Sequence, residues 1–537
     1  MWPHHYTPVA ESLALSSVCA ALPIFVLLVM IGILRKPAWI AALAGLAGAL
    51  AVALFVYGMP AGTAFASVLY GASFGLFPIG WIVYWAIVLY RITVETGNFE
   101  IIKDSIGGLT EDRRLQAMLI AFALGAFIEG AAGFGTPVAV AAAMLTGLGF
   151  SPFYAASICL LANTAPVAFG SIGIPVVTLA GITSLPVNEL SAWVGRICAP
   201  VSVFIPAYLV MVMGGMRALK GVLPAAILCG TAFAGTQFYV SNYIGPQLTD
   251  ILAALASIIV MVALLKVWKP SDTFHLTEES SPQLKPAPHG AGRTLLAWSP
   301  YLFLVFFVLL WGQKPVQEIL NAATAKFPWP GLHGMVQRMP PVVAAPAPYA
   351  AEYTFNFLSA AGSACMFATL ASMLVLRVSI GKYAGILVAV GKQLFFSMVT
   401  VAAVLGLAFL MNYCGATSTL GLAFAATGAA FPFFSAMLGW LGVFLTGSDT
   451  SANALFGNLQ VVTANRLGLD PVLMAAANSS GGVMGKMISL QSIAVAAAAT
   501  SMQPSDESRL FRFTLRHSIF LASVLGVITF IYASMQK

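Results

Sequence analysis

The chain is dominated by apolar segments long enough to cross a lipid bilayer as helices. A helix of about 20 apolar residues spans the hydrocarbon core of a membrane, and such segments recur from residue 13 to residue 533. Only 8% of the residues are charged and 60% are hydrophobic, whereas soluble domains carry about 25% charged residues. Several segments are too long or too interrupted for one plain helix. The sequence therefore predicts an all-α polytopic membrane protein with about 12–14 transmembrane helices, some of them broken.

The distribution of charge predicts the topology. The first span is followed by Arg35 and Lys36 and has no small-residue cleavage site, so we expect a retained helix rather than a signal peptide. Residues 1–12 and the turn 58–63 hold no Lys or Arg, whereas the loop 91–114 contains Arg91, Lys103, Arg113 and Arg114. The positive-inside rule, which counts Lys and Arg, then places the N-terminus outside. The net charge of +7 is spread over loops, which argues against nucleic-acid binding. The cysteines and histidines form no ligand pattern, so we expect no metal and no cofactor.

A polar stretch, "KPSDTFHLTEESSPQLKPAPHGAGR" at 269–293, lies at the midpoint of the chain and is typical of a linker. We predict a first transmembrane half at 1–268, a linker at 269–297 and a second half at 298–537. Three blocks recur in the same order in both halves: "GAFIEG" and "GVFLTG", "GFSPFYAAS" and "GLDPVLMAA", "NTAPVAFG" and "NSSGGVMG". This duplication predicts two repeat halves, which we expect to be inverted, as in many secondary transporters.

Two segments combine short polar residues, glycines and turn-forming positions within apolar flanks: "NTAPVAFGSIGIP" at 163–175 and "NSSGGVMGKMIS" at 478–489. A helix that stops inside a membrane frees backbone groups, which are tolerated only where protein or a water-filled cavity satisfies them and which can bind a solute. We predict that both segments are hairpin tips that meet at mid-bilayer. The substrate-binding residues predicted there are Asn163, Thr164, Asn478, Ser479 and Ser480. The alternative is that the small residues only serve close helix packing.

Three ionisable residues lie inside predicted spans, where a charge costs about 2.5–3.5 kcal/mol on insertion scales. Glu129 and Asp449 are our candidates for proton coupling, because a carboxyl group held away from water can bind and release a proton as access to water changes. Lys486 and Ser448 are candidates for binding an anionic solute. Other interpretations stay open: a neutral or paired Glu129 that joins helices, a helix N-cap at Ser448 and Asp449, and a snorkelling Lys486.

Several long motifs resemble the bacterial L-lactate permease family, which includes glycolate permeases. They are "GAFIEGAAGFGTPVAV", "NTAPVAFGSIGIP", "QRMPPVV", "LGWLGVFLTGSDTSANALFG", "GGVMGKMISLQSIA" and "LFRFTLRHS". The resemblance covers essentially the whole chain. It implies a multi-pass transporter of the bacterial inner membrane that imports L-lactate, D-lactate and glycolate by proton symport. It also implies kinship with a wider group of often dimeric elevator-type transporters, and so allows a homodimer.

Two other classes of function, and one variant of the carrier, compete with this interpretation. A hydrolase is disfavoured, because the sequence has no HExxH motif, no paired-aspartate protease motif and no histidine near a candidate serine within a span. A carrier for another small carboxylate, coupled to sodium, is an alternative. An anion channel is a further one, because pores also use polar residues at helix breaks. The expected partners are thus a small carboxylate, protons and the lipid bilayer.

Overall fold

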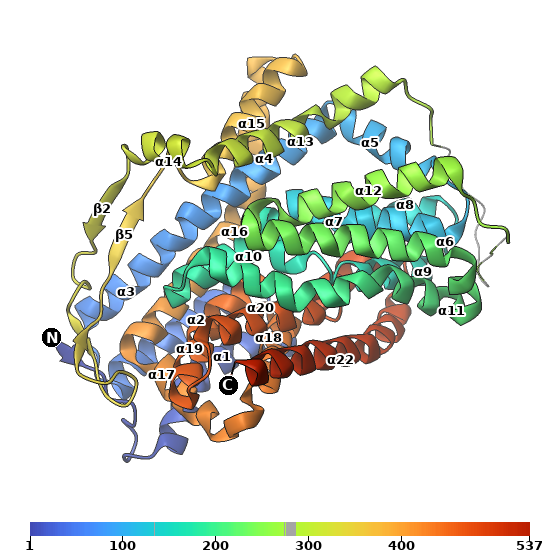
Figure 1. The fold of residues 1–537 in the computed structure, drawn as a ribbon. Helices are drawn as coiled ribbons and strands as arrows, with labels where there is room; N and C mark the ends of the chain where they lie inside the picture. The colour runs from blue at the N-terminus through green and yellow to red at the C-terminus, as the bar shows by residue number, and fades with distance from the viewer. Residues whose placement is uncertain (134, 273, 275, 277–285, 537) are drawn as a thin grey trace.

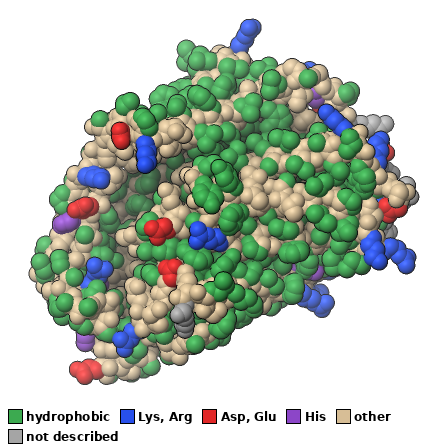
Figure 2. All heavy atoms as spheres, in the orientation of Figure 1, with side chains coloured by type: hydrophobic (Ala, Val, Ile, Leu, Met, Phe, Trp, Pro, Cys, Tyr) green, Lys and Arg blue, Asp and Glu red, His purple; other side chains and the backbone are tan. Residues whose placement is uncertain are grey.

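The computed structural model describes residues 1–133, 135–272, 274, 276 and 286–536, and these form a bundle of helices with a few short strands (Figure 1). Eleven of the described helices are long and apolar enough to cross a membrane, or up to twelve if one bent pair counts as a single span. Hydrophobic side chains cover much of the face shown in Figure 2, and charged side chains are few. The predicted all-α polytopic fold is confirmed, with eleven or at most twelve such helices where 12–14 were expected.

The elements before the linker include short π-helical or 3₁₀ turns, labelled η. They are β1 (Trp2–Pro3), α1 (Leu13–Gly32), α2 (Ala38–Ala51), η1 (Val52–Val56), α3 (Ala61–Phe74), η2 (Gly75–Gly80), α4 (Trp81–Glu95), α5 (Asn98–Gly107), α6 (Arg113–Gln116), η3 (Ala117–Leu124), α7 (Gly125–Ala131), α8 (Thr136–Gly147), α9 (Pro152–Ala162), η4 (Val167–Phe169), α10 (Gly170–Thr183), α11 (Val187–Tyr243), η5 (Pro246–Leu248) and α12 (Thr249–Val267).

The elements after the linker begin with one long helix and a small group of strands. They are α13 (Ala291–Trp311), α14 (Lys314–Asn321), β2 (Ala325–Pro328), β3 (Val336–Arg338), β4 (Ala347–Pro348), β5 (Glu352–Phe355), α15 (Ala361–Val375), α16 (Ile380–Cys414), α17 (Ala416–Phe424), η6 (Ala425–Ala430), α18 (Phe431–Thr446), α19 (Asp449–Leu467), α20 (Pro471–Lys486), α21 (Leu490–Ala499) and α22 (Pro504–Met535).

Helix α11 folds back on itself. A straight helix of its 57 residues would be about 85 Å long, far more than a bilayer needs. Its backbone leaves helical geometry at Gly214 and Val222. Beyond that bend the two arms run side by side, since the Ser191 hydroxyl donates a hydrogen bond to the Ser241 carbonyl at 2.9 Å. The single element α11 therefore consists of two helical arms, each of which can cross the membrane.

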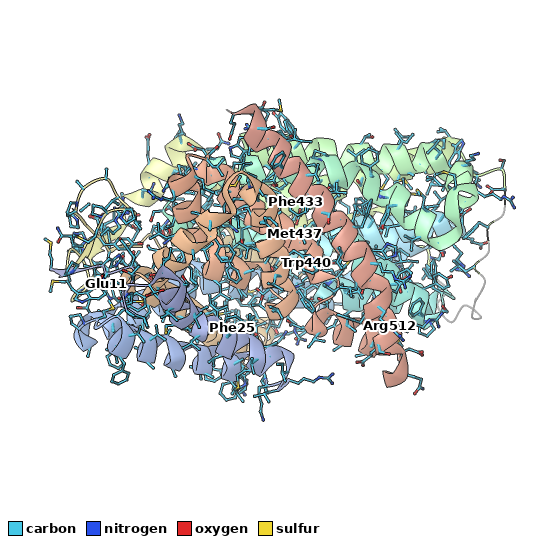
Figure 3. All side chains as sticks on the ribbon, turned by 90° about the horizontal axis from the view of Figure 1, so that it is seen from below. Glu11, Phe25, Phe433, Met437, Trp440 and Arg512 are labelled. Carbon is cyan, nitrogen blue, oxygen red and sulfur yellow. The ribbon has the colours of Figure 1, made fainter. Side chains whose placement is uncertain are left out.

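The long helices form two packing groups. In the first, α16 packs against α2, α3 and α4, and α15 packs against α4 and α13. Gly71 of α3 lies directly against the backbone of Leu405 in α16, a close approach that only a small residue permits. In the second group α18, α20 and α22 all pack against one another, and the Trp440 indole of α18 donates to the Ser518 hydroxyl of α22 at 2.8 Å. Figure 3 shows α18, with Trp440, between α1 at Phe25 and α22 at Arg512.

The N-terminus and the strands cap one end of α16. Strand β1 pairs in parallel with β3, which pairs with β4, while β2 pairs antiparallel with β5. The His4 ring binds the Tyr413 carbonyl, at the end of α16, with 2.8 Å between Nε2 and the oxygen. Burial lowers the pKa of His4 to about 4, so this imidazole is neutral near pH 7 and holds the terminus in place as a neutral group.

The last residues of the predicted linker are helical. Helix α13 begins at Ala291, inside the predicted range 269–297, because the Ala- and Leu-rich sequence there already favours a helix. Residues 273, 275 and 277–285 of the linker lie outside the described residues. Its first part is held by Asp272, which accepts hydrogen bonds from the fully buried Arg114 at 2.8 and 3.0 Å.

Candidate substrate and ion-coupling site

Two helical hairpins and two interrupted helices surround the centre of the molecule. Helix α8 packs against both α7 and the preceding η3, so the chain doubles back between α7 and α8. It doubles back again between α18 and α19, which also pack together. Each hairpin is followed by an interrupted helix: α9 and α10 meet at an angle of 64°, and α20 is separated from α21 by residues 487–489. The recurring blocks "GAFIEG" and "GVFLTG" both end the first helix of a hairpin.

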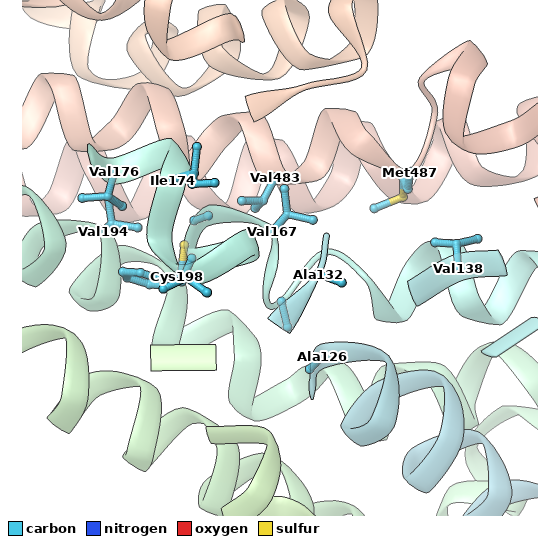
Figure 4. Close-up of a cluster of buried hydrophobic side chains, with 14 of the residues drawn as sticks. Ala126, Ala132, Val138, Val167, Ile174, Val176, Val194, Cys198, Val483 and Met487 are labelled. Carbon is cyan, nitrogen blue, oxygen red and sulfur yellow. The ribbon is translucent and has the colours of Figure 1, made fainter. Parts of the chain in front are cut away.

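The hairpins and the interrupted helices contact each other crosswise. Helix α8, from the first hairpin, packs against α21, and α19, from the second hairpin, packs against α10. Figure 4 shows the apolar side of this crossing, with Val167 and Ile174 near Val483, and Val138 opposite Met487. Segments from the two parts of the sequence therefore build one shared centre.

A cavity of about 160 Å³ lies at this crossing. It is lined by α7, η4, α10, α16, the turn from α18 to α19, and the ends of α20 and α21. Its polar lining includes Glu129, Ser171, Thr400, Ser448, Asp449 and Lys486. Four residues predicted from the sequence are thereby brought together: Glu129, Ser448, Asp449 and Lys486.

Glu129 lies near the end of α7 and is only 4% exposed. Its Oε1 atom packs against Gly170, so closely that a Cβ atom added to this glycine would lie only 2.7 Å from it. Its Oε2 atom has no hydrogen-bond partner among the described residues. The carboxyl group is therefore held at the cavity wall by close packing. Its Oε2 atom is free to bind a proton or to accept a hydrogen bond.

Asp449 begins α19 and is 3% exposed. Its Oδ2 atom accepts hydrogen bonds from the Ser479 hydroxyl at 2.6 Å and from the Asn453 amide at 3.4 Å. Its Oδ1 atom lies against Gly482 and has no partner within the described part of the chain. Like Glu129, Asp449 lines the cavity and combines an oxygen atom held by neighbouring groups with one that has no partner among the described residues.

Lys486 ends α20, and its side chain reaches the turn of the second hairpin. Its Nζ atom donates to the Gly447 carbonyl at 2.8 Å, and its charge acts on both Glu129 and Asp449. It takes part in none of the ion pairs among the described residues. Ser448 is the N-cap of α19, where its hydroxyl accepts from the Ser451 N–H at 3.2 Å. Ser448 therefore both caps a helix and lines the cavity.

The other five predicted substrate ligands do not line the cavity. Asn478, Ser479 and Ser480 lie inside α20, which stays helical to Lys486. Within the predicted second tip, 478–489, the helix is therefore interrupted only at the last residues, 487–489. Glycines explain the difference, because Gly481 lies against the backbone of α18 and the small residues serve close packing. Asn478 and Ser479 instead join a buried polar network that supports Asp449.

The first predicted tip is an interruption between α9 and α10 rather than a reversal of the chain. Asn163 caps the end of α9, and its buried side chain lies beside Glu129. The Thr164 hydroxyl donates to the Leu161 carbonyl at 2.7 Å. Direct contact of these residues with a substrate stays a prediction.

Sequence reasoning missed several polar residues of this region. Ser171 lines the cavity and donates to the Ala132 carbonyl, at the end of α7, at 3.1 Å. Ser171 and Ile172 have φ angles of 48° and 60°, a left-handed conformation that is rare for a β-branched residue and concentrates at functional sites. Asp250 is a third buried acid. Ser171 could have been found from the sequence, because it lies between glycines in "FGSIGIP". Asp250 could not, because it resembles an ordinary acid in the first turn of a helix.

The sequence model of a family described as L-lactate permease matches residues 16–536. The chain belongs to the L-lactate permease family. It is 45% identical to the L-lactate permease of Bacillus subtilis (strain 168), over 99% of this chain and 98% of that protein. It is 44% identical to both the glycolate permease GlcA and the L-lactate permease of Escherichia coli (strain K12), again over 99% of this chain and 98% of each relative.

Membership of this family and the membrane-spanning helices identify a transporter rather than an enzyme. They also identify a multi-pass protein of the bacterial inner membrane, as predicted. Among solved structures, that of Neisseria gonorrhoeae MtrF matches 88% of this chain and 83% of its own, with 14% sequence identity and a TM-score of 0.45, which is too distant a likeness to support any inference.

Proposed function

We propose that this member of the family imports L-lactate and the related 2-hydroxymonocarboxylates D-lactate and glycolate in symport with protons. The names of the relatives support the substrate class. The observation that carries the proposal is one cavity in which a lysine and two acids from different parts of the chain meet. The sequence halves 1–268 and 298–537 are, in this proposal, the two repeats that build it.

The cavity suits a small anion that also carries a hydroxyl group. A cavity of roughly 150 Å³ holds benzene, a molecule with about six non-hydrogen atoms, and lactate has the same number. Lys486 supplies the positive charge for the carboxylate, and the hydroxyls of Ser448 and Thr400 can bind its oxygens or the 2-hydroxyl.

The charges favour binding of a proton together with the anion. If Glu129 and Asp449 were both ionised, the single positive charge of Lys486 would leave the cavity negative, and an arriving carboxylate would be repelled. A proton on either acid removes that repulsion, so substrate and proton bind together in this proposal. One monoanion with one proton carries no net charge. Transport then draws no energy from the membrane potential but about 1.4 kcal/mol from each unit of pH difference.

The test uses Glu129→Gln in proteoliposomes with labelled L-lactate. We expect the variant to lose accumulation driven by a pH gradient while it still exchanges internal for external lactate, because Gln keeps the shape of the side chain but cannot release a proton. A variant that fails to fold would show that Glu129 is structural. Accumulation that follows voltage at zero pH difference would contradict the proposed stoichiometry.

Measurements on the unmodified protein separate the two alternatives. A sodium-coupled carrier would accumulate lactate only when sodium is present. An anion channel would show no acceleration of uptake by lactate on the opposite side, whereas a carrier does.

A further inference from the structure

Asp250 is a buried acid that the proposed substrate site leaves unexplained. It lies in the first turn of α12, is 1% exposed and does not line the cavity. Both of its carboxyl oxygens lack a hydrogen-bond partner among the described residues, and it joins none of the ion pairs found there. An unpaired carboxylate in such a place is strongly disfavoured, and ionisable groups within membranes persist mainly where they function.

Helix α12 presents Asp250 directly to the helix that carries Glu129. A Cβ atom added to Gly130 would lie 2.8 Å from the Asp250 Cβ, so α7 and α12 are in close contact at the residue next to Glu129. Helix α12 also packs against α10, α11, η3 and η5. On the elements that contact α12, two titratable groups interact electrostatically with Asp250: the Glu129 carboxyl and the Cys198 thiol. The charge of Lys486 acts on Glu129.

We propose that Asp250 is a second proton-binding group of the transport cycle, paired with Glu129 so that a negative charge on either carboxyl group opposes ionisation of the other. Two acids that interact in a low-dielectric interior titrate as a pair, and the first charge opposes the second. When the O–H bond of Glu129 breaks, an O–H bond forms on Asp250, and the negative charge moves the other way. Nothing is oxidised or reduced. Asp250 acts through Glu129 and does not touch the substrate.

This inference rests on the proposed proton symport and is tested by the pH profile of lactate exchange in proteoliposomes. In the unmodified protein, exchange should fall as rising pH removes the proton from Glu129. Asp250→Asn removes the neighbouring charge that helps to keep that proton bound. We expect the midpoint of the profile to move down by about one pH unit or more, together with a loss of accumulation driven by a pH gradient. Asp250→Glu, which keeps a carboxyl group, should stay near the original midpoint.

The matched control is Glu100→Gln, which neutralises an exposed acid of α5 and should leave the midpoint unchanged. If Asp250→Asn does not reach the membrane, Asp250→Ser serves the same test, because it is also neutral and is smaller. An unshifted midpoint in the neutral variants would overturn the inference, as would an equal loss of exchange at every pH in the neutral and the Glu variants. Exchange by the unmodified protein that did not depend on pH would instead refute proton symport itself.

Discussion

Replacement of Gly170 by alanine should move the Glu129 carboxyl group without changing its chemistry. Gly170 has φ −60° and ψ 157°, an extended conformation that alanine adopts freely. The new Cβ atom would lie 2.7 Å from Oε1 and 3.1 Å from Cγ of Glu129, whereas unstrained contacts between carbon atoms begin near about 3.5 Å. The carboxyl group therefore has to move by about 0.5–1 Å. Its side chain can rotate, so the fold should lose no more than about 1 kcal/mol.

The expected effect of Gly170→Ala is functional. A displacement of about 1 Å at a reacting group can reduce a rate by about 10²-fold. We therefore expect lactate accumulation driven by a pH gradient to slow by about 10- to 100-fold in proteoliposomes, with a thermal unfolding midpoint close to that of the unmodified protein.

Gly485→Ala is the matched control for this experiment. Its Cβ atom would meet the Trp440 carbonyl in the backbone of α18, which cannot rotate away. This variant should lose about 1–3 kcal/mol of stability through overpacking. Unchanged transport by Gly170→Ala would refute the claim that the position of the Glu129 carboxyl matters. A loss of stability equal to that of Gly485→Ala would show that Gly170 only serves packing.

Two further changes test the anion path. Lys486→Gln should raise the KM for lactate by about 10- to 100-fold, since a hydrogen bond to a charged group contributes about 1.5–3 kcal/mol; an unchanged KM in uptake assays would place the carboxylate elsewhere. Arg35 and Lys36 line a second cavity of about 450 Å³ that shares Thr446, Gly447 and two other residues with the first. Replacing both by Gln should slow lactate efflux several-fold at low salt, and less at about 0.15 M salt. A rate loss independent of salt would exclude electrostatic steering.

The membrane fold and the central charges could be predicted because both depend on a large energetic penalty. Charged residues are costly within a bilayer, so Glu129, Asp449 and Lys486 stood out from their apolar surroundings, and the structure places all three on one cavity. Asp250 did not stand out, since an acid in the first turn of a helix is ordinary. Its depth is set by tertiary packing, in which the turn before α12 lies against Gly173 at the first helix interruption.

The hairpins were harder to locate because glycine has two uses in membranes. In "NSSGGVMG" the small residues let α20 approach α18, and the helix continues. In "TGSD" the glycine reverses the chain, and Gly447 has a φ of 72°, which favours glycine. Both stretches combine glycine with short polar residues. Whether the helix continues or the chain reverses is decided by the helix that packs against the glycine.

A similar hydrogen bond recurs at the two ends of the site. Lys486, at the interruption after the second hairpin, donates to the Gly447 carbonyl in the turn of that hairpin. Ser171, at the interruption after the first hairpin, donates to the Ala132 carbonyl, where the first helix of that hairpin ends. Each donor also lines the cavity. A carboxylate bound by Lys486 would therefore compete with the Gly447 carbonyl for its ammonium protons, so that substrate binding and the position of the hairpin turn cannot be independent.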